Sequence, residues 1–336
     1  MLPEKIMEIE ATPGAHAVGM PITIPSTTRQ RLTFLKNLMA NRKALAGALI
    51  VVFFIMIALL APVIAPGDPT AFVGRPHQEP SAEHWFGTEG QGKDVFTQTV
   101  HGARISLTVG FATGILTTIV GLLVGMTAGF FRGRVDDALS MLMNLFLVIP
   151  GLPLLVVISA YLRPSVWTIV VALVFTGWAW PARIIRSQML TLREKDFVSA
   201  ATVSGEGNTR IIFREIMPNM ASIIVGGMIG SVIYAIGAEA ALSALGLTNV
   251  SDISWGTNLY WAQNNSGLLV GAWWTFIPSG LCIAFVAFGL SLINYGMDEV
   301  TNPRLRAEKD LKNVLKNRVL RNFRNVRATP VVRREH

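Results

Sequence analysis

The most evident shortage in this sequence is charge. Asp, Glu, Lys and Arg make up only 15% of its 336 residues, whereas 51% are hydrophobic and the mean hydropathy is +0.47. Soluble domains usually carry about 25% charged residues, so this composition excludes an ordinary soluble protein. Cysteine is almost absent as well. Cys282 is the single one, which excludes an internal disulfide.

Charge is missing in blocks that are long enough to cross a bilayer, since about 20 helical residues span about 30 Å of hydrocarbon. Glu239 is the one charged side chain inside these blocks, and the last block starts near Leu268 because the residues before it are polar. The pattern predicts an all-α, polytopic membrane protein with six transmembrane helices. The blocks are residues 44–67, 105–131, 138–162, 164–182, 216–251 and 268–297.

The basic residues predict the orientation, because Lys and Arg accumulate on the cytoplasmic side of membrane proteins. If both termini are cytoplasmic, all but four of the 29 lie on that side; the exceptions are Arg75, Lys93, Arg104 and Arg163. The net charge of +8 is then explained by topology and by contact with anionic lipid headgroups, and nucleic-acid binding is not needed to account for it.

This topology divides the chain into segments. Residues 1–43 are expected to form a cytoplasmic segment with a basic amphipathic helix, and residues 44–66 the first transmembrane helix. An extracytoplasmic segment follows at 67–103. Residues 104–300 would form a five-helix core that contains a cytoplasmic loop at 188–219, and residues 301–336 a basic cytoplasmic tail.

The stretch "FGTEGQGKDV" is close to a nucleotide-binding P-loop, with four residues between Gly87 and the pair Gly92-Lys93. A P-loop then needs Ser or Thr to bind magnesium, but the next residue is Asp94, and no apolar strand precedes the stretch. It also falls on the outer side of the membrane, where ATP is absent. We interpret it as a glycine-rich turn before a helix capped by Asp94, and expect no catalytic residue.

Histidines and tryptophans on the outer side are two further candidates for a binding site. His77, His84 and His101 are spaced too widely for a compact metal motif, so neither a metal nor a cofactor is expected. Tryptophans near the start of the last span favour a belt at the membrane interface. These are Trp255, Trp261, Trp273 and Trp274.

The loop at 188–219 is longer than a simple connection requires. Asp196 is expected to cap a short helix in which Ala200 and Ala201 would permit close approach by a partner. Gly205 should end it, and Pro218 should open the next span. On periodicity alone, the loop could also be an amphipathic hairpin that lies on the membrane surface.

Several segments resemble the C-type permease subunits of dipeptide, oligopeptide and nickel ABC importers, from about Ala44 to Arg306. They include "HWFGTEGQGKDVFTQTVHGARISLTVG", "FRGRVDDALSMLMNLFLVIPGLPLL", "AEAALSALGL" and the loop "REKDFVSAATVSGEGNTRIIFREIMPN". In that family the loop reads Glu-Ala-Ala, three residues, Gly, and then Pro thirteen residues later. Ala200, Ala201, Gly205 and Pro218 fit this spacing, and Ser199 replaces the Glu.

The resemblance implies the permease fold of a type I ABC importer in a prokaryotic plasma membrane. It also implies partners: a homologous second permease, two ATPase subunits and an extracytoplasmic binding protein. Short peptides are the first expected substrate, and di- or oligosaccharides the alternative. The residues expected to contact the ATPase are Asp196, Ser199, Ala200, Ala201, Gly205, Met217 and Pro218.

Three residues inside the predicted spans are candidates for the translocation pathway. Glu239 could instead be protonated or hydrogen-bonded to a neighbouring helix, or could couple a secondary transporter to an ion gradient, although no second acid or histidine accompanies it in the spans. Pro150 should break the third span, by a kink or by exposing backbone groups to a pathway. Asn144 stands where related permeases often have Asp, which speaks against nickel transport.

Overall fold

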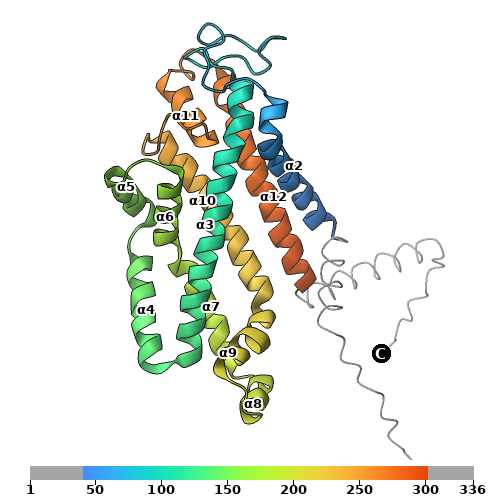
Figure 1. The fold of residues 1–336 in the computed structure, drawn as a ribbon, viewed down its shortest axis with the longest axis vertical. Coiled ribbons are helices and arrows are strands. Elements are labelled where there is room, and N and C mark those ends of the chain that lie inside the picture. Colours follow the sequence, from blue (N-terminus) through green and yellow to red (C-terminus); the bar gives the residue numbers. More distant parts are fainter. Residues whose placement is uncertain (1–40, 302–336) are drawn as a thin grey trace, which may run out of the picture.

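The computed structural model describes residues 41–301 (Figure 1). Within this range the chain is helical apart from its loops and two isolated β-bridges, Phe72 with Lys93 and Thr88 with Asp94. The basic tail lies outside the described residues, as does nearly all of the amphipathic helix expected before residue 44.

Four helices in the described range are long and apolar enough to cross a membrane. Two further pairs of helices pass the same test, and they raise the number to six if each bent pair is one span. The predicted all-helical, polytopic fold is therefore confirmed. The long helices are α2 (Arg42–Ile64), α3 (Val95–Phe131), the helical run Asn208–Ala244 that ends in α10 (Ala221–Ala244), and α12 (Ile277–Thr301).

The two bent pairs differ in the sharpness of the bend. The helices α4 (Gly133–Val148) and α5 (Gly151–Tyr161) meet at 84°. Pro150 lies between them and is the N-cap of α5, so the break predicted there is confirmed. The helices α6 (Val166–Gly177) and α7 (Ala179–Arg193) meet at 42°.

The helix boundaries differ most from those read from charge at three places. The helix α3 starts at Val95, ahead of Arg104, because Arg104 is exposed and a charge is tolerated there. The helix α7 continues to Arg193, well past the end of the charge-free block. The last span begins at Ile277 rather than near Leu268, since the chain before it turns through positive φ at Ser266 and Gly271.

The turn before α3 matches the sequence interpretation. The Asp94 carboxylate accepts from the Thr97 backbone N–H at 2.7 Å, which makes Asp94 the N-cap. Gly87 and Gly92 both have positive φ, at 67° and 80°. A glycine-rich turn capped by Asp94 is confirmed.

The helix α3 lies at the centre of the bundle, between α7 and α10, with α2 and α12 on one side (Figure 1). Close packing depends on residues without side chains. A Cβ at Gly125 of α3 would lie 2.4 Å from the Ala182 carbonyl oxygen of α7. Between α2 and α12, a Cβ at Gly47 would lie 2.3 Å from the carbonyl oxygen of Gly289.

Candidate functional site

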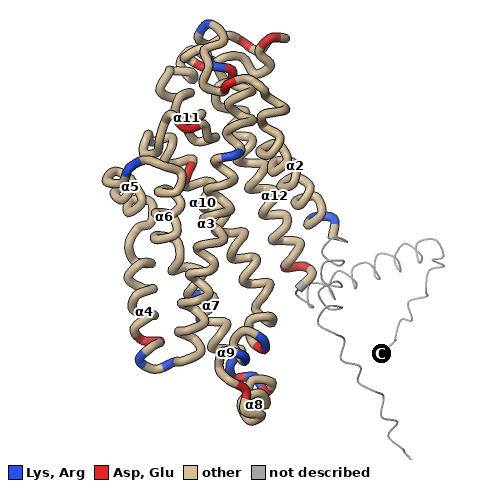
Figure 2. The backbone as a smooth tube through the Cα atoms, viewed as in Figure 1, with Lys and Arg blue, Asp and Glu red and all other residues tan. Residues whose placement is uncertain are grey.

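The short helix α8 (Asp196–Val203) lies at the lower tip of the molecule, beyond the ends of the long helices (Figure 1). Lys and Arg gather at this end, around α8 and α9 (Asn208–Arg210), whereas the middle of the bundle is almost free of charge (Figure 2). Asp196, Ser199 and Ala200 are exposed on α8, and the apolar side chain of Val203 is 89% exposed.

The inner side of α8 is fixed to the bundle. Val198 is buried in a cluster that includes Phe130 of α3 and Met189 of α7. The Arg193 guanidinium donates to the Phe130 carbonyl and lies 5.3 Å from the centre of its ring. A force applied to α8 would therefore reach the lower ends of α3 and α7.

Gly205 ends α8 in a Schellman motif. Its backbone has φ +80°, its N–H donates to the Thr202 carbonyl at 3.0 Å, and the Glu206 N–H donates to the Ala201 carbonyl at 3.1 Å. These are the two backbone hydrogen bonds that define the motif, and glycine is preferred at the left-handed position. The expected helix end at Gly205 is confirmed.

The rest of the predicted coupling residues occupy the same region. Ala201 and Met217 are half-buried against the cluster around Val198. Pro218 is exposed in a short 3₁₀ helix, Met217–Met220, between the π-helical turn Ile211–Ile216 and α10. One detail was wrong: Asp196 is the first residue of α8 and makes no cap hydrogen bond, and Lys195 is the N-cap. Contact of these residues with an ATPase stays a prediction.

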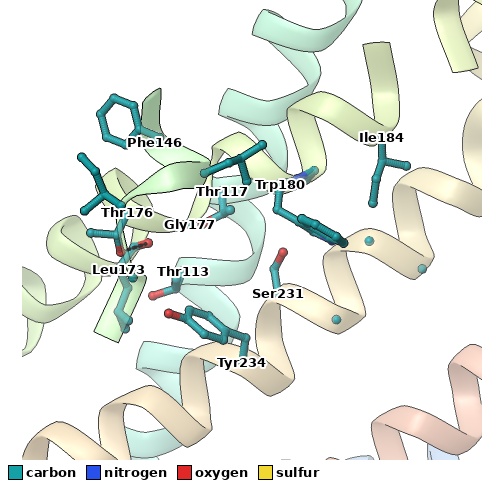
Figure 3. Close-up of a pocket in the computed structure, with 17 residues that line it drawn as sticks. Thr113, Thr117, Phe146, Leu173, Thr176, Gly177, Trp180, Ile184, Ser231 and Tyr234 are labelled. Carbon is teal, nitrogen blue, oxygen red and sulfur yellow. Dashed lines mark hydrogen bonds between the residues drawn. The ribbon is translucent and has the colours of Figure 1, made fainter. Parts of the chain in front are cut away.

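A cavity of about 620 Å³ lies between α3, α6, α7 and α10, beside the bend between α4 and α5. Trp180 and Tyr234 are 64% and 43% exposed, so the cavity opens to the outside of this chain. Figure 3 shows both rings around the same space as Thr113, Thr117 and Ser231. These residues could not be identified as a site from the sequence, because hydroxyl side chains in an apolar helix do not reveal which neighbouring helix they face.

The three candidate pathway residues are not brought together, and none of them lines this cavity. Asn144 is exposed on α4. Pro150 is exposed at the bend, although its neighbours Ile149 and Gly151 do line the cavity. Glu239 is buried elsewhere in α10. Their part in a pathway stays a prediction.

The Glu239 carboxylate accepts hydrogen bonds from three serine hydroxyls. Ser254 and Ser243 donate to Oε1 at 2.7 and 2.9 Å, and Ser106 of α3 donates to Oε2 at 3.1 Å. Ser254 is also the N-cap of α11 (Trp255–Asn264). The hydrogen bonding expected between Glu239 and neighbouring helices is confirmed: its 1%-exposed side chain joins α3, α10 and the start of α11.

The outer segment is fastened to the chain between α11 and α12. The Asn265 amide donates to the Glu89 carboxylate at 2.8 Å, and the Trp274 indole N–H donates to the Thr88 carbonyl at 3.1 Å. Trp255 is fully buried and Trp274 is 7% exposed, so the prediction of a membrane-interface belt was wrong for these two rings.

No cluster of three or more His, Cys, Asp or Glu that could hold a metal occurs in the described residues.

A helical bundle with apolar spans and a helix pair projecting at its basic end is typical of an integral membrane protein. Residues 121–307 match the family described as "Binding-protein-dependent transport system inner membrane component", and residues 31–82 match "N-terminal TM domain of oligopeptide transport permease C". The chain belongs to the first of these families, and its resemblance to C-type permeases is confirmed.

Curated relatives agree with the family match. The chain is 32% identical to the oligopeptide transport system permease protein OppC of Bacillus subtilis over 80% of its own length and 87% of the relative's. It is 35% identical to the dipeptide transport system permease protein DppC of the same organism, over 81% and 85%. A putative peptide transport system permease protein of Brucella suis is 35% identical, over 81% and 92%.

Among solved structures, a chain of the inward-facing MetNI methionine ABC transporter aligns with a TM-score of 0.49 at 19% identity, over 61% of this chain and 94% of that one. From its family, the protein is a permease subunit of an ABC transport system and a multi-pass bacterial inner membrane protein. ATP hydrolysis belongs to separate subunits, and ATPase and binding-protein partners are implied.

Proposed function

We propose that this chain forms half of the membrane pathway of an ATP-driven peptide importer and receives the force of ATP hydrolysis through residues 188–219. The observation that carries the proposal is α8, which exposes Ser199, Ala200 and Val203 at the tip while Val198 fixes it to α3 and α7. An exposed apolar side chain on a rigid projection is suited to a partner's groove.

Peptides are the proposed substrate because the relatives described above are named for oligopeptide, dipeptide or peptide transport. Those names favour peptides over the di- and oligosaccharides considered as the alternative. A charge-free cavity wall is compatible with transported peptides whose side chains vary, since none of the described residues that line it is Asp, Glu, Lys, Arg or His.

The proposed complex contains a homologous second permease, two ATPase subunits and an extracytoplasmic binding protein. Exposure of Trp180 and Tyr234 at the cavity supports a second permease that closes the pathway from the open side. ATP binding would draw the ATPases together, and each docked α8 would move with its ATPase and tilt the helices above it. Anionic lipids would contact the basic residues at the lower end.

The energy source tests this proposal. With all partner subunits present, peptide uptake should persist when the proton gradient is collapsed and ATP is maintained. The alternative is a secondary transporter coupled to ions through Glu239. Peptide uptake by this chain alone in liposomes, driven by a pH step, would contradict the proposal.

We further propose that both termini and residues 188–219 are cytoplasmic and that residues 67–103 face outward. Lys93 should then be accessible from outside and Arg193 should not, because the two residues lie at opposite ends of the bundle. Cysteine at either position, on a Cys282→Ala background, can be labelled with an impermeant thiol reagent on intact cells. Labelling at position 193 and not at 93 would reverse the topology.

A further inference from the structure

Two buried hydroxyl groups in the cavity wall have no hydrogen-bond partner among the described residues. Thr113 and Thr117 of α3 both line the cavity, and each side chain is only 2% exposed. Their Oγ1 atoms are buried and unpaired. A buried hydroxyl without a partner costs about 1–3 kcal/mol, so a second arrangement that satisfies it is expected.

Other threonines of the same helix satisfy their hydroxyls with a local backbone hydrogen bond. Thr99, Thr118 and Thr127 of α3 donate to the carbonyl four residues earlier, at 2.8, 2.7 and 2.6 Å. This local bond is the usual way for a helical threonine to satisfy its hydroxyl. Thr113 and Thr117 depart from it, and they are the threonines of α3 that face the cavity.

The described residues that form the cavity wall around them carry no charge, and several of them are glycines without a side chain. Tyr234 and Ser231 of α10 add two more hydroxyls (Figure 3). Gly227 and Gly230 also line the cavity, and a Cβ at either would meet nothing within 4 Å. The volume of about 620 Å³ falls within the range of about 300–1,000 Å³ that is usual for ligand sites.

The spacing of the two hydroxyls matches a peptide backbone. Residues four apart in an α-helix are separated by about 6 Å along its axis. In an extended peptide, carbonyls that point to the same side recur every two residues, or about 6.6 Å. Both oxygens are covered in the arrangement described here, so each threonine side chain must first rotate toward the cavity. Thr113 and Thr117 could then donate to two such carbonyls of one extended chain.

We propose that this cavity is a binding site for the backbone of the transported peptide in an extended conformation, held by the hydroxyls of Thr113 and Thr117. The site binds the amide backbone of the peptide, and its affinity does not depend on the charge of the peptide side chains. This inference rests on the proposed function in peptide import, and it adds a binding step inside the membrane.

The test uses Thr113→Val with Thr117→Val in the complete reconstituted complex, with tetraalanine, Ala-Lys-Ala-Ala and Ala-Glu-Ala-Ala as probes, because a tetrapeptide is the shortest chain with two amide carbonyls two residues apart. Uptake of all three should fall by a similar factor of about ten, from the loss of two hydrogen bonds. Complex assembly and thermal stability should not fall, because valine matches threonine in shape and no existing hydrogen bond is removed. Thr118→Val is the control, since Thr118 is buried on the same helix but outside the cavity.

Wild-type uptake of all three peptides by the double variant would overturn the site and leave the proposed function intact. A loss confined to one charged peptide would also overturn it, because the site would then read side chains. Failure of the wild-type complex to take up any peptide would instead refute the proposed function. A second measurement labels Gly230→Cys on a Cys282→Ala background, because Gly230 is exposed in the cavity wall and a Cβ there would meet nothing within 4 Å in the described residues. Excess tetraalanine should slow this labelling, and unchanged labelling would contradict the site.

Discussion

Replacing Gly205 with valine is expected to leave the membrane helices inserted while separating ATP hydrolysis from peptide uptake. Gly205 has φ +80°, a conformation that costs a residue with a side chain about 1–2 kcal/mol. A Cβ there would meet nothing within 4 Å in the part of the chain that the structure describes, so the cost is in the backbone and at any partner surface. The Schellman end of α8 should shift, and a β-branched side chain would project from the proposed docking surface.

The measurement is co-purification of the ATPase subunits, together with substrate-stimulated ATP hydrolysis in reconstituted complexes. A change of about 1–2 kcal/mol corresponds to a loss of roughly 5- to 30-fold in docking. Gly207→Val is a matched control, because Gly207 is also exposed with open space around it but has φ −70°. Equal, wild-type values for both variants would show that α8 is not the coupling element.

Replacing Glu239 with leucine is expected to abolish assembly, whereas glutamine should preserve most transport. Leucine would remove the acceptor of the hydroxyl hydrogens of Ser106, Ser243 and Ser254, at about 1–3 kcal/mol for each hydrogen that finds no other acceptor. Glutamine can keep all three partners. Its oxygen can accept from Ser243 and Ser254, and its amide can donate to Ser106, whose hydroxyl hydrogen is then free to turn.

Detergent-extracted yield and thermal stability report assembly, and ATP-driven uptake reports transport. The two variants form the comparison, because they differ in hydrogen bonding while both remove the charge. A glutamine variant that assembles normally but transports nothing would contradict a structural role in which Glu239 only holds α3, α10 and the start of α11 together. It would assign Glu239 to ion coupling or to substrate contact.

The coupling region was the part best predicted from sequence, and its chemistry explains why. Glycine at a left-handed helix end is a local requirement, so Gly205 could be placed without knowledge of the fold. The cap at Asp196 was wrong by one residue, because several polar residues compete near a helix start and backbone geometry selects among them.

The cavity could not be predicted because it depends on which helices are neighbours. Thr117 and Thr118 are adjacent in sequence, yet one faces the cavity and the other donates to the Gly114 carbonyl. The charge-free block at 105–131 covers only part of α3, since Arg104 lies on an exposed side of the helix, whereas the cap at Asp94 gave the true start. Glu239 could be singled out for its rarity, but its serine partners come from three separate segments.

The contact between α2 and α12 can form only at the end of synthesis, because the two helices lie near opposite ends of the described chain. Gly47 fits against Gly289, and the Asn41 amide donates to the Glu299 carboxylate at 3.0 Å, so the first described helix packs on the last. At about 5–20 residues per second, roughly 10 to 40 s of synthesis separate the two helices. During that interval α2 has no α12 beside it, and a chain truncated before Ile277 would expose that unfilled helix surface to the proteases that remove incomplete membrane proteins.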